Sequence, residues 1–140
     1  MPHPGAAPGP ADRAELRRLA GLMGSGRYHL DPDGIRTLAP DVWLIPGRGY
    51  VCLVQRTAAA AGLGGGAGRR PGIGGGCVTV RKALTDGIAT GGPDGFLVAV
   101  PDDVSAIEAR YRWHGPWKRI AAPGGLARLP GLGYQVRLAR

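Results

Sequence analysis

Apolar residues of the type found in strands first gather after residue 41. Residues 42–45 (Val-Trp-Leu-Ile) and 50–54 (Tyr-Val-Cys-Leu-Val) are rich in β-branched and aromatic side chains. The four residues between them, Pro-Gly-Arg-Gly, have the composition of a turn. The pattern therefore predicts a β-hairpin over residues 42–54.

Further strand patterns occupy the second half of the chain. Residues 96–100 form a continuous apolar run, which predicts a central strand. Residues 107–113 and 134–138 alternate between apolar and polar side chains, so each segment is expected to have one buried and one solvent-facing side. With shorter strands expected elsewhere, about seven to nine strands predict a mainly β fold, either a small antiparallel sandwich or a partly open barrel.

One helix is expected at the N-terminal end of the fold. Asp12 is a good N-cap, and Glu15 three residues later completes a pattern like a capping box. Leu16, Leu19 and Leu22 follow at helical spacing. These signals predict a helix from about residue 12 to residue 23.

Two segments have few side chains that can pack. Residues 1–10 are mostly Pro, Gly and Ala and are expected to form a disordered arm. Residues 57–76 include nine glycines and are expected to form a long flexible loop. The remainder, residues 11–140, is predicted to be a single β-rich domain that carries this loop, with a second short helix near residues 80–85.

The composition adds a strong positive charge. Eighteen basic and ten acidic residues give a formal net charge of +8, and sixteen of the basic residues are arginine. Such a charge favours nonspecific attraction to nucleic acid or other polyanions. The alternative is codon bias, because a chain rich in Gly, Ala, Pro and Arg with only two lysines is typical of GC-rich DNA. The arginines are scattered along the chain, which favours codon bias over a dedicated basic tail.

No segment has the pattern of a membrane span or a signal peptide. No apolar run approaches the roughly 20 residues that a transmembrane helix needs. The first residues, Met-Pro-His-Pro-Gly, are not followed by the apolar stretch of a signal peptide.

The two cysteines are the sharpest chemical feature. Cys52 lies in the predicted hairpin, and Cys77 follows three glycines at the end of the predicted loop. In an oxidising compartment we expect them to form a disulfide, whereas in a reducing cytosol two buried thiols are favoured. A catalytic cysteine at position 77, with His29 or His114 beside it, is a weaker alternative because the spacing does not bring these residues together. No pair of residues has the spacing of metal ligands, and neither a metal nor another cofactor is expected.

One surface is a candidate for binding anions. Arg110 and Arg112 are expected to share a strand face, and Arg137 would lie beside them if the two alternating segments pair. Trp113, Trp117 and Tyr134 are interleaved with these cations in the sequence, and such a face suits a polyanion or single-stranded nucleic acid. The alternative, which we favour from the sequence alone, is a solvated sheet face with its aromatic residues in the core.

Two other motifs are set aside. The glycine-rich segment lacks the phosphate-binding pattern G-x-x-x-x-G-K-[ST], so a flexible loop explains it better. Asp102 and Asp103 follow a proline and are expected to be turn residues rather than a catalytic pair. The sequence therefore predicts no catalytic residue.

Three segments together carry a resemblance: residues 42–53 (VWLIPGRGYVCL), 74–77 (GGGC) and 100–105 (VPDDVS). Their order resembles a group of uncharacterised proteins from high-GC Gram-positive bacteria, many of which have an N-terminal signal or a membrane anchor. The resemblance spans about residues 35–112. It implies an extracytoplasmic β-rich domain whose two cysteines are bridged, and it implies no activity. This chain differs from the group in having no anchor and an unusually glycine-rich loop.

These observations lead to three hypotheses for function. The first is a non-enzymatic binding or structural module of an envelope-associated or secreted protein, with a protein or cell-envelope partner. The second is an electrostatic binder of nucleic acid or another polyanion, and the third is a cysteine-dependent enzyme.

Overall fold

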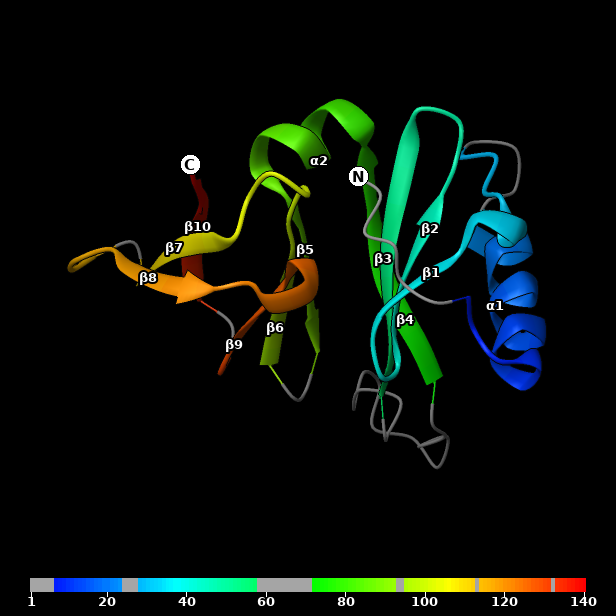
Figure 1. Cartoon of the computed structure of the whole chain (residues 1–140). Helices are drawn as coiled ribbons and strands as arrows, with labels where there is room; N and C mark the ends of the chain where they lie inside the picture. The colour runs from blue at the N-terminus through cyan, green and yellow to red at the C-terminus, as the bar shows by residue number, and fades with distance from the viewer. Residues whose placement is uncertain (1–6, 24–27, 58–71, 93–94, 113, 132) are drawn as a thin grey trace.

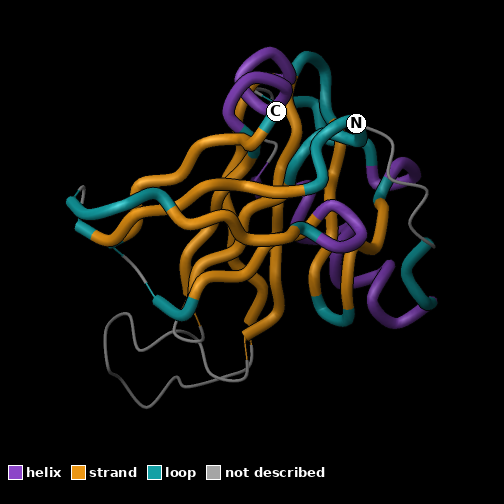
Figure 2. The backbone as a smooth tube through the Cα atoms, turned by 60° about the vertical axis from the view of Figure 1, so that its left-hand side comes forward, coloured by secondary structure: helices purple, strands orange, loops and turns teal. Residues whose placement is uncertain are grey.

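The computed structural model describes residues 7–23, 28–57, 72–92, 95–112, 114–131 and 133–140 (Figure 1). These residues confirm the predicted mainly β fold with a helix at its N-terminal end (Figure 2). The helices are α1 (Pro10–Met23) and α2 (Val80–Asp86), with two short 3-10 helices, η1 (Pro32–Gly34) and η2 (Pro123–Gly125). The strands are β1 (Arg36–Ala39), β2 (Val42–Pro46), β3 (Tyr50–Thr57), β4 (Gly72–Thr79), β5 (Ile88–Gly92), β6 (Gly95–Ala99), β7 (Ala106–Tyr111), β8 (Lys118–Ala121), β9 (Leu126–Leu129) and β10 (Tyr134–Ala139).

The strands form three antiparallel sheets that are stacked as layers. The helix-covered sheet has the order β1-β2-β3-β4, the middle sheet β5-β6-β9 and the outer sheet β10-β7-β8. Figure 1 shows α1 at one side of the molecule, followed by the helix-covered, middle and outer sheets in turn. A separate apolar cluster fills each of the three spaces between neighbouring layers. Within the described residues the strands do not close into a barrel.

The middle sheet is buried on both of its faces. Its central strand β6 pairs with β5 on one side and β9 on the other. Leu97 and Ala99 pack in the cluster shared with the helix-covered sheet, whereas Val98 packs in the cluster shared with the outer sheet. A strand covered on both faces needs apolar residues at consecutive positions, as in residues 96–100. The predicted central strand is confirmed.

The predicted hairpin is formed by β2 and β3. Trp43 and Ile45 face α1, and Leu44 and Leu53 face the middle sheet. Both faces of these strands are therefore covered, which explains why their sequence does not alternate. Gly49 in the connecting turn has a φ of 73°, a conformation that glycine adopts without steric cost.

The helix α1 begins two residues earlier than its capping signals predict. Pro10 opens it, and the carbonyl of Gly9 accepts a hydrogen bond from the Arg13 amide over 2.8 Å. Proline is well tolerated in the first turn because its missing N–H needs no partner there. Asp12 therefore lies inside the first turn, where its carboxylate accepts a hydrogen bond from Arg56 instead of capping the helix.

The predicted boundaries of the arm and of the flexible loop need correction, and Pro10, assigned to the arm over 1–10, belongs to α1. Residues 72–76, assigned to a flexible loop over 57–76, form the first part of β4 and pair with β3. The physical reason is close packing, because a Cβ at Gly75 would collide with the carbonyl oxygen of Leu53. Residues 58–71 of the predicted loop, and residues 1–6 of the predicted arm, lie outside the described residues.

Candidate functional site

The solvent face of the outer sheet carries most of the side chains expected to bind anions. Strands β7 and β10 pair as the sequence hypothesis required, with Arg110 opposite Gln135 and Glu108 opposite Arg137. On the other side of β7, Arg119 of β8 lies opposite Glu108. Residues directly opposite one another project to the same face of a sheet. Arg137, Glu108 and Arg119 thus form one row across the three strands.

Two of these arginines pack on a tryptophan. The Cζ atom of Arg137 lies 3.9 Å from the centroid of the Trp117 ring, and that of Arg110 lies 4.7 Å from it. The Nε atom of Arg110 donates to Gln135 Oε1 over 2.6 Å, and the Nε atom of Arg137 donates to Glu108 Oε1 over 2.9 Å. Each guanidinium is therefore held by an aromatic contact and by a hydrogen bond that it donates to a neighbouring strand.

The terminal nitrogens of these two guanidiniums have no hydrogen-bond partner among the described residues, since only Nε is engaged in each. Arg137 has a side-chain exposure of 53%, so its ion pair with Glu108 contributes little to stability. Three arginines and one glutamate leave this face with an excess of positive charge. The arrangement orients exposed N–H donors toward solvent, which suits phosphate or carboxylate oxygens.

The prediction that Arg112 shares a strand face with Arg110 is wrong. Strand β7 ends at Tyr111, and Arg112 has a φ of 51°, so the chain turns at this position. The Cζ atom of Arg112 lies 5.2 Å from the centroid of the Tyr111 ring. Arg112 extends the positive charge beyond the end of the sheet without joining the face.

The aromatic residues divide between the two sides of the outer sheet. Tyr134 packs against the apolar cluster shared with the middle sheet and against Tyr111, with ring centroids 5.2 Å apart. Trp117 is the aromatic residue that lies among the arginines, and Trp113 lies outside the described residues. Sequence reasoning missed Arg119, because only the pairing of β8 with β7 places it opposite Glu108.

The predicted cysteine pair is present. Cys52 and Cys77 lie directly opposite each other on β3 and β4, and their sulfur atoms are 1.98 Å apart, at disulfide distance. Cys52 is fully buried. A bonded sulfur is not a thiolate, so in this state neither cysteine is a nucleophile. Within the described part of the chain, no cluster of three or more His, Cys, Asp or Glu residues could hold a metal ion.

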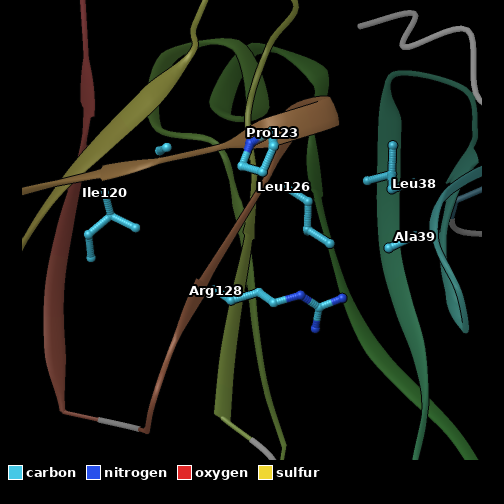
Figure 3. Close-up of a pocket in the computed structure, with 7 residues that line it drawn as sticks. Leu38, Ala39, Ile120, Pro123, Leu126 and Arg128 are labelled. Atoms are coloured by element: carbon cyan, nitrogen blue, oxygen red, sulfur yellow. The ribbon is translucent and has the colours of Figure 1, made fainter.

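A second feature is an open groove along one side of the sandwich, here called the side groove. Its volume is about 510 Å³, and it opens between β1 of the helix-covered sheet and β9 of the middle sheet. In Figure 3 the Arg128 side chain extends from β9 toward Leu38 and Ala39 on β1. The residues that line the groove are Leu38, Ala39, Ile120, Ala121, Pro123, Leu126 and Arg128.

Comparison with known proteins gives no relative from which to transfer a function. No family model, curated protein or solved structure matches the chain. Among the residues that the structure describes, neither helix has the length and apolar character needed to cross a membrane.

Proposed function

We propose that this chain is a non-enzymatic binding module that holds an anionic polymer on the solvent face of its outer sheet. The observation that carries the proposal is the packing of Arg110 and Arg137 on the ring of Trp117. Two guanidiniums fixed in this way lose little conformational freedom when they bind an oxyanion. Arg119, in the same row as Arg137, adds a further cation to that face.

The packing also favours one mode of recognition over another. A tryptophan that binds single-stranded nucleic acid usually offers an open ring face on which a base stacks. The Trp117 ring is in contact with two guanidiniums instead. Recognition through the charged backbone of a polymer is therefore favoured over recognition of its bases.

The ligand we propose is a phosphate- or carboxylate-bearing polymer of the cell envelope. The cysteine pair at disulfide distance supports an oxidising compartment, where such bonds persist. The resemblance of residues 35–112 to extracytoplasmic proteins agrees with that location. Nucleic acid is the competing polyanion, and a strong preference for an oligonucleotide in the experiment below would identify it as the ligand instead.

Salt-dependent binding tests this proposal. The full chain is titrated with poly(glycerol phosphate) and with an oligothymidylate of equal charge, over a range of salt concentrations. Because recognition depends on backbone charge, both ligands are expected to bind with a steep loss of affinity as salt rises. A double variant, Arg110→Gln with Arg137→Gln, should flatten the plot of log affinity against log salt by about 0.7 per lost contact.

The matched control removes the same charge from the other side of the molecule. Arg13→Gln with Arg18→Gln changes two exposed arginines of α1, and neither residue has an ion pair with a described residue. This variant should keep the slope measured for the unmodified chain. Equal weakening by both double variants would mean that net charge alone attracts the polymer. Strong preference for the oligothymidylate would contradict backbone recognition, and the absence of binding at low salt would end the proposal.

A further inference from the structure

Arg128 occupies an unusual position for a charged residue. It is the one charged side chain on the described strands of the middle sheet, whose two faces are otherwise packed against other layers. Its cross-strand partner is Leu97, which is only 4% exposed, and Leu126 lies two residues away on the same face. The Arg128 side chain is exposed, and it forms no ion pair or hydrogen bond with any described residue. Its guanidinium is therefore a solvent-accessible charge without an anionic partner, beside an apolar core.

The side groove that Arg128 enters is otherwise lined mainly by apolar side chains. Leu126 belongs to the apolar cluster between the helix-covered and middle sheets, and Leu38 and Ala39 pack against the same cluster. The volume of about 510 Å³ lies within the range of roughly 300–1,000 Å³ found for ligand clefts. Such clefts typically combine an apolar lining with a few polar groups that orient the ligand.

The edge of the groove is poorly suited to a peptide strand. Strand β1 has only four residues, and its pairing with β2 is irregular between Thr37 and Ala39. Short and irregular edge strands disfavour the addition of another strand. Pro123 of η2 also lines the groove beside β1, and it has no N–H to donate. The groove is therefore expected to bind its ligand through side chains rather than through backbone pairing.

We propose that the side groove binds a linear aliphatic monocarboxylate. The carboxylate pairs with the Arg128 guanidinium, which can donate two parallel N–H bonds to its oxygens. The aliphatic chain lies between β1 and β9 on Leu38, Ala39 and Leu126. This site is separate from the solvent face of the outer sheet, so the tests of the two proposals are independent of each other.

Titration of the full chain with octanoate tests this site. Octan-1-ol is the uncharged comparison, and hexanoate is the shorter acid. Amide chemical shifts of the isotopically labelled chain report both the affinity and the residues that respond. Octanoate should bind with one-to-one saturation and shift the amides of Leu38, Ala39, Leu126 and Arg128. A hydrogen bond to a charged group corresponds to about tenfold or more in affinity, so octan-1-ol should bind at least about tenfold more weakly. Each buried methylene adds up to about fourfold, so hexanoate should also be weaker.

Variants then separate this site from nonspecific attraction to a basic protein. Arg128→Gln should lower octanoate affinity to that of octan-1-ol and leave octan-1-ol binding unchanged. Arg128→Lys, which keeps the charge, should retain part of the preference for the acid. Arg18→Gln removes an equal charge from α1, which lies on the other side of the helix-covered sheet, and should have no effect. The proposal is overturned if octanoate does not saturate, if its shifts map to another surface, or if Arg128→Gln binds octanoate as the unmodified chain does.

Discussion

Arg56 lies over the buried ring of Trp43, with its Cζ atom 5.4 Å from the ring centroid, and joins α1 to the helix-covered sheet. Its Nη2 atom donates to Asp12 over 2.8 Å and to Glu15 over 2.9 Å, both on α1. Its Nε atom lies 3.9 Å from Asp41 Oδ1, beyond hydrogen-bond distance. The hydrogen bond to Asp12 raises the pKa of Arg56 above its ordinary value, against the opposing effect of burial. A single half-buried cation therefore connects three carboxylates to the sheet.

Replacing Arg56 with Met should lower the free energy of unfolding by about 2 kcal/mol, because hydrogen bonds to charged groups contribute about 1.5–3 kcal/mol when partly buried. Because the pKa of Arg56 is raised, its charge is present at every pH below strong alkali, and the loss should be the same at pH 6 and pH 9. Urea denaturation followed by circular dichroism measures both. Arg17→Met is the control, since Arg17 and Asp33 form an ion pair with side-chain exposures of 56% and 78%. A pair so exposed should contribute less than about 1 kcal/mol. Equal losses in the two variants would contradict the anchoring role of Arg56.

Two neighbouring glycines of β4 should respond in opposite ways to the same substitution. A Cβ at Gly75 would collide with the Leu53 carbonyl oxygen and lie 2.8 Å from the Cα atom of Val54, whereas a Cβ at Gly76 meets nothing within 4 Å. Gly75→Ala must push β4 away from β3 and should cost about 1–3 kcal/mol, the usual range for overpacking. Gly76→Ala should be neutral or stabilise by about 0.4–1 kcal/mol through the unfolded state. Thermal unfolding of the two variants measures both effects. An unchanged stability of Gly75→Ala would show that β3 and β4 do not need to approach closely at this position.

The same glycines show why the sequence did not predict the full extent of β4. Strands β2, β3 and β6 were predictable because both of their faces are covered, which demands consecutive apolar residues. Residues 72–76 have the composition of a loop, and they form a strand because the backbone of β3 lies against them. That cause lies some twenty residues earlier in the chain, where no local pattern reports it.

The candidate site was predictable to a similar extent. Alternation in residues 107–113 and 134–138 predicted two strands with one solvent-facing side each, but it left open whether these strands pair, and the structure shows that they do. The turn at Arg112 depends on a positive φ, which an arginine seldom adopts and which its sequence therefore does not indicate. Arg128 belongs to a four-residue strand, Leu-Ala-Arg-Leu, whose sequence does not reveal that it enters a groove between two sheets. Contacts between layers decide such positions.

The cysteine pair should contribute strongly to stability. In the chain-entropy model, a bond between residues separated by 25 positions contributes about 3.5 kcal/mol. Reduction of the unmodified chain, and the double change Cys52→Ala with Cys77→Ala, should each lower the free energy of unfolding by about 2–5 kcal/mol. Denaturation with and without reductant measures the first effect. Alkylation followed by mass spectrometry gives the state of the thiols directly. If both cysteines alkylate in the folded protein purified without reductant, they are not bonded. The cysteine pair would then give no support for an oxidising compartment.

Trp117 should matter for polymer binding more than for folding. The ring is only partly buried, so Trp117→Leu should change the free energy of unfolding by less than about 1 kcal/mol, as surface substitutions do. Without the ring, Arg110 and Arg137 lose the contacts that hold their guanidiniums, and ordering each side chain on binding then costs about 0.5–1.5 kcal/mol. Affinity for poly(glycerol phosphate) should therefore fall by at least about fivefold, which corresponds to a loss of about 1 kcal/mol.

The dependence of this loss on salt distinguishes positioning from charge. Trp117→Leu removes no cation, so the slope of log affinity against log salt should stay close to that of the unmodified chain, in contrast to the flatter slope expected when Arg110 and Arg137 are replaced. Tyr50→Leu is the aromatic control, because Tyr50 packs on Tyr28, with ring centroids 4.9 Å apart, and belongs to the helix-covered sheet. This control should leave polymer affinity unchanged. If Trp117→Leu binds the polymer as tightly as the unmodified chain, the ring does not organise the arginines for binding, and their packing on it is only a feature of the solvated sheet.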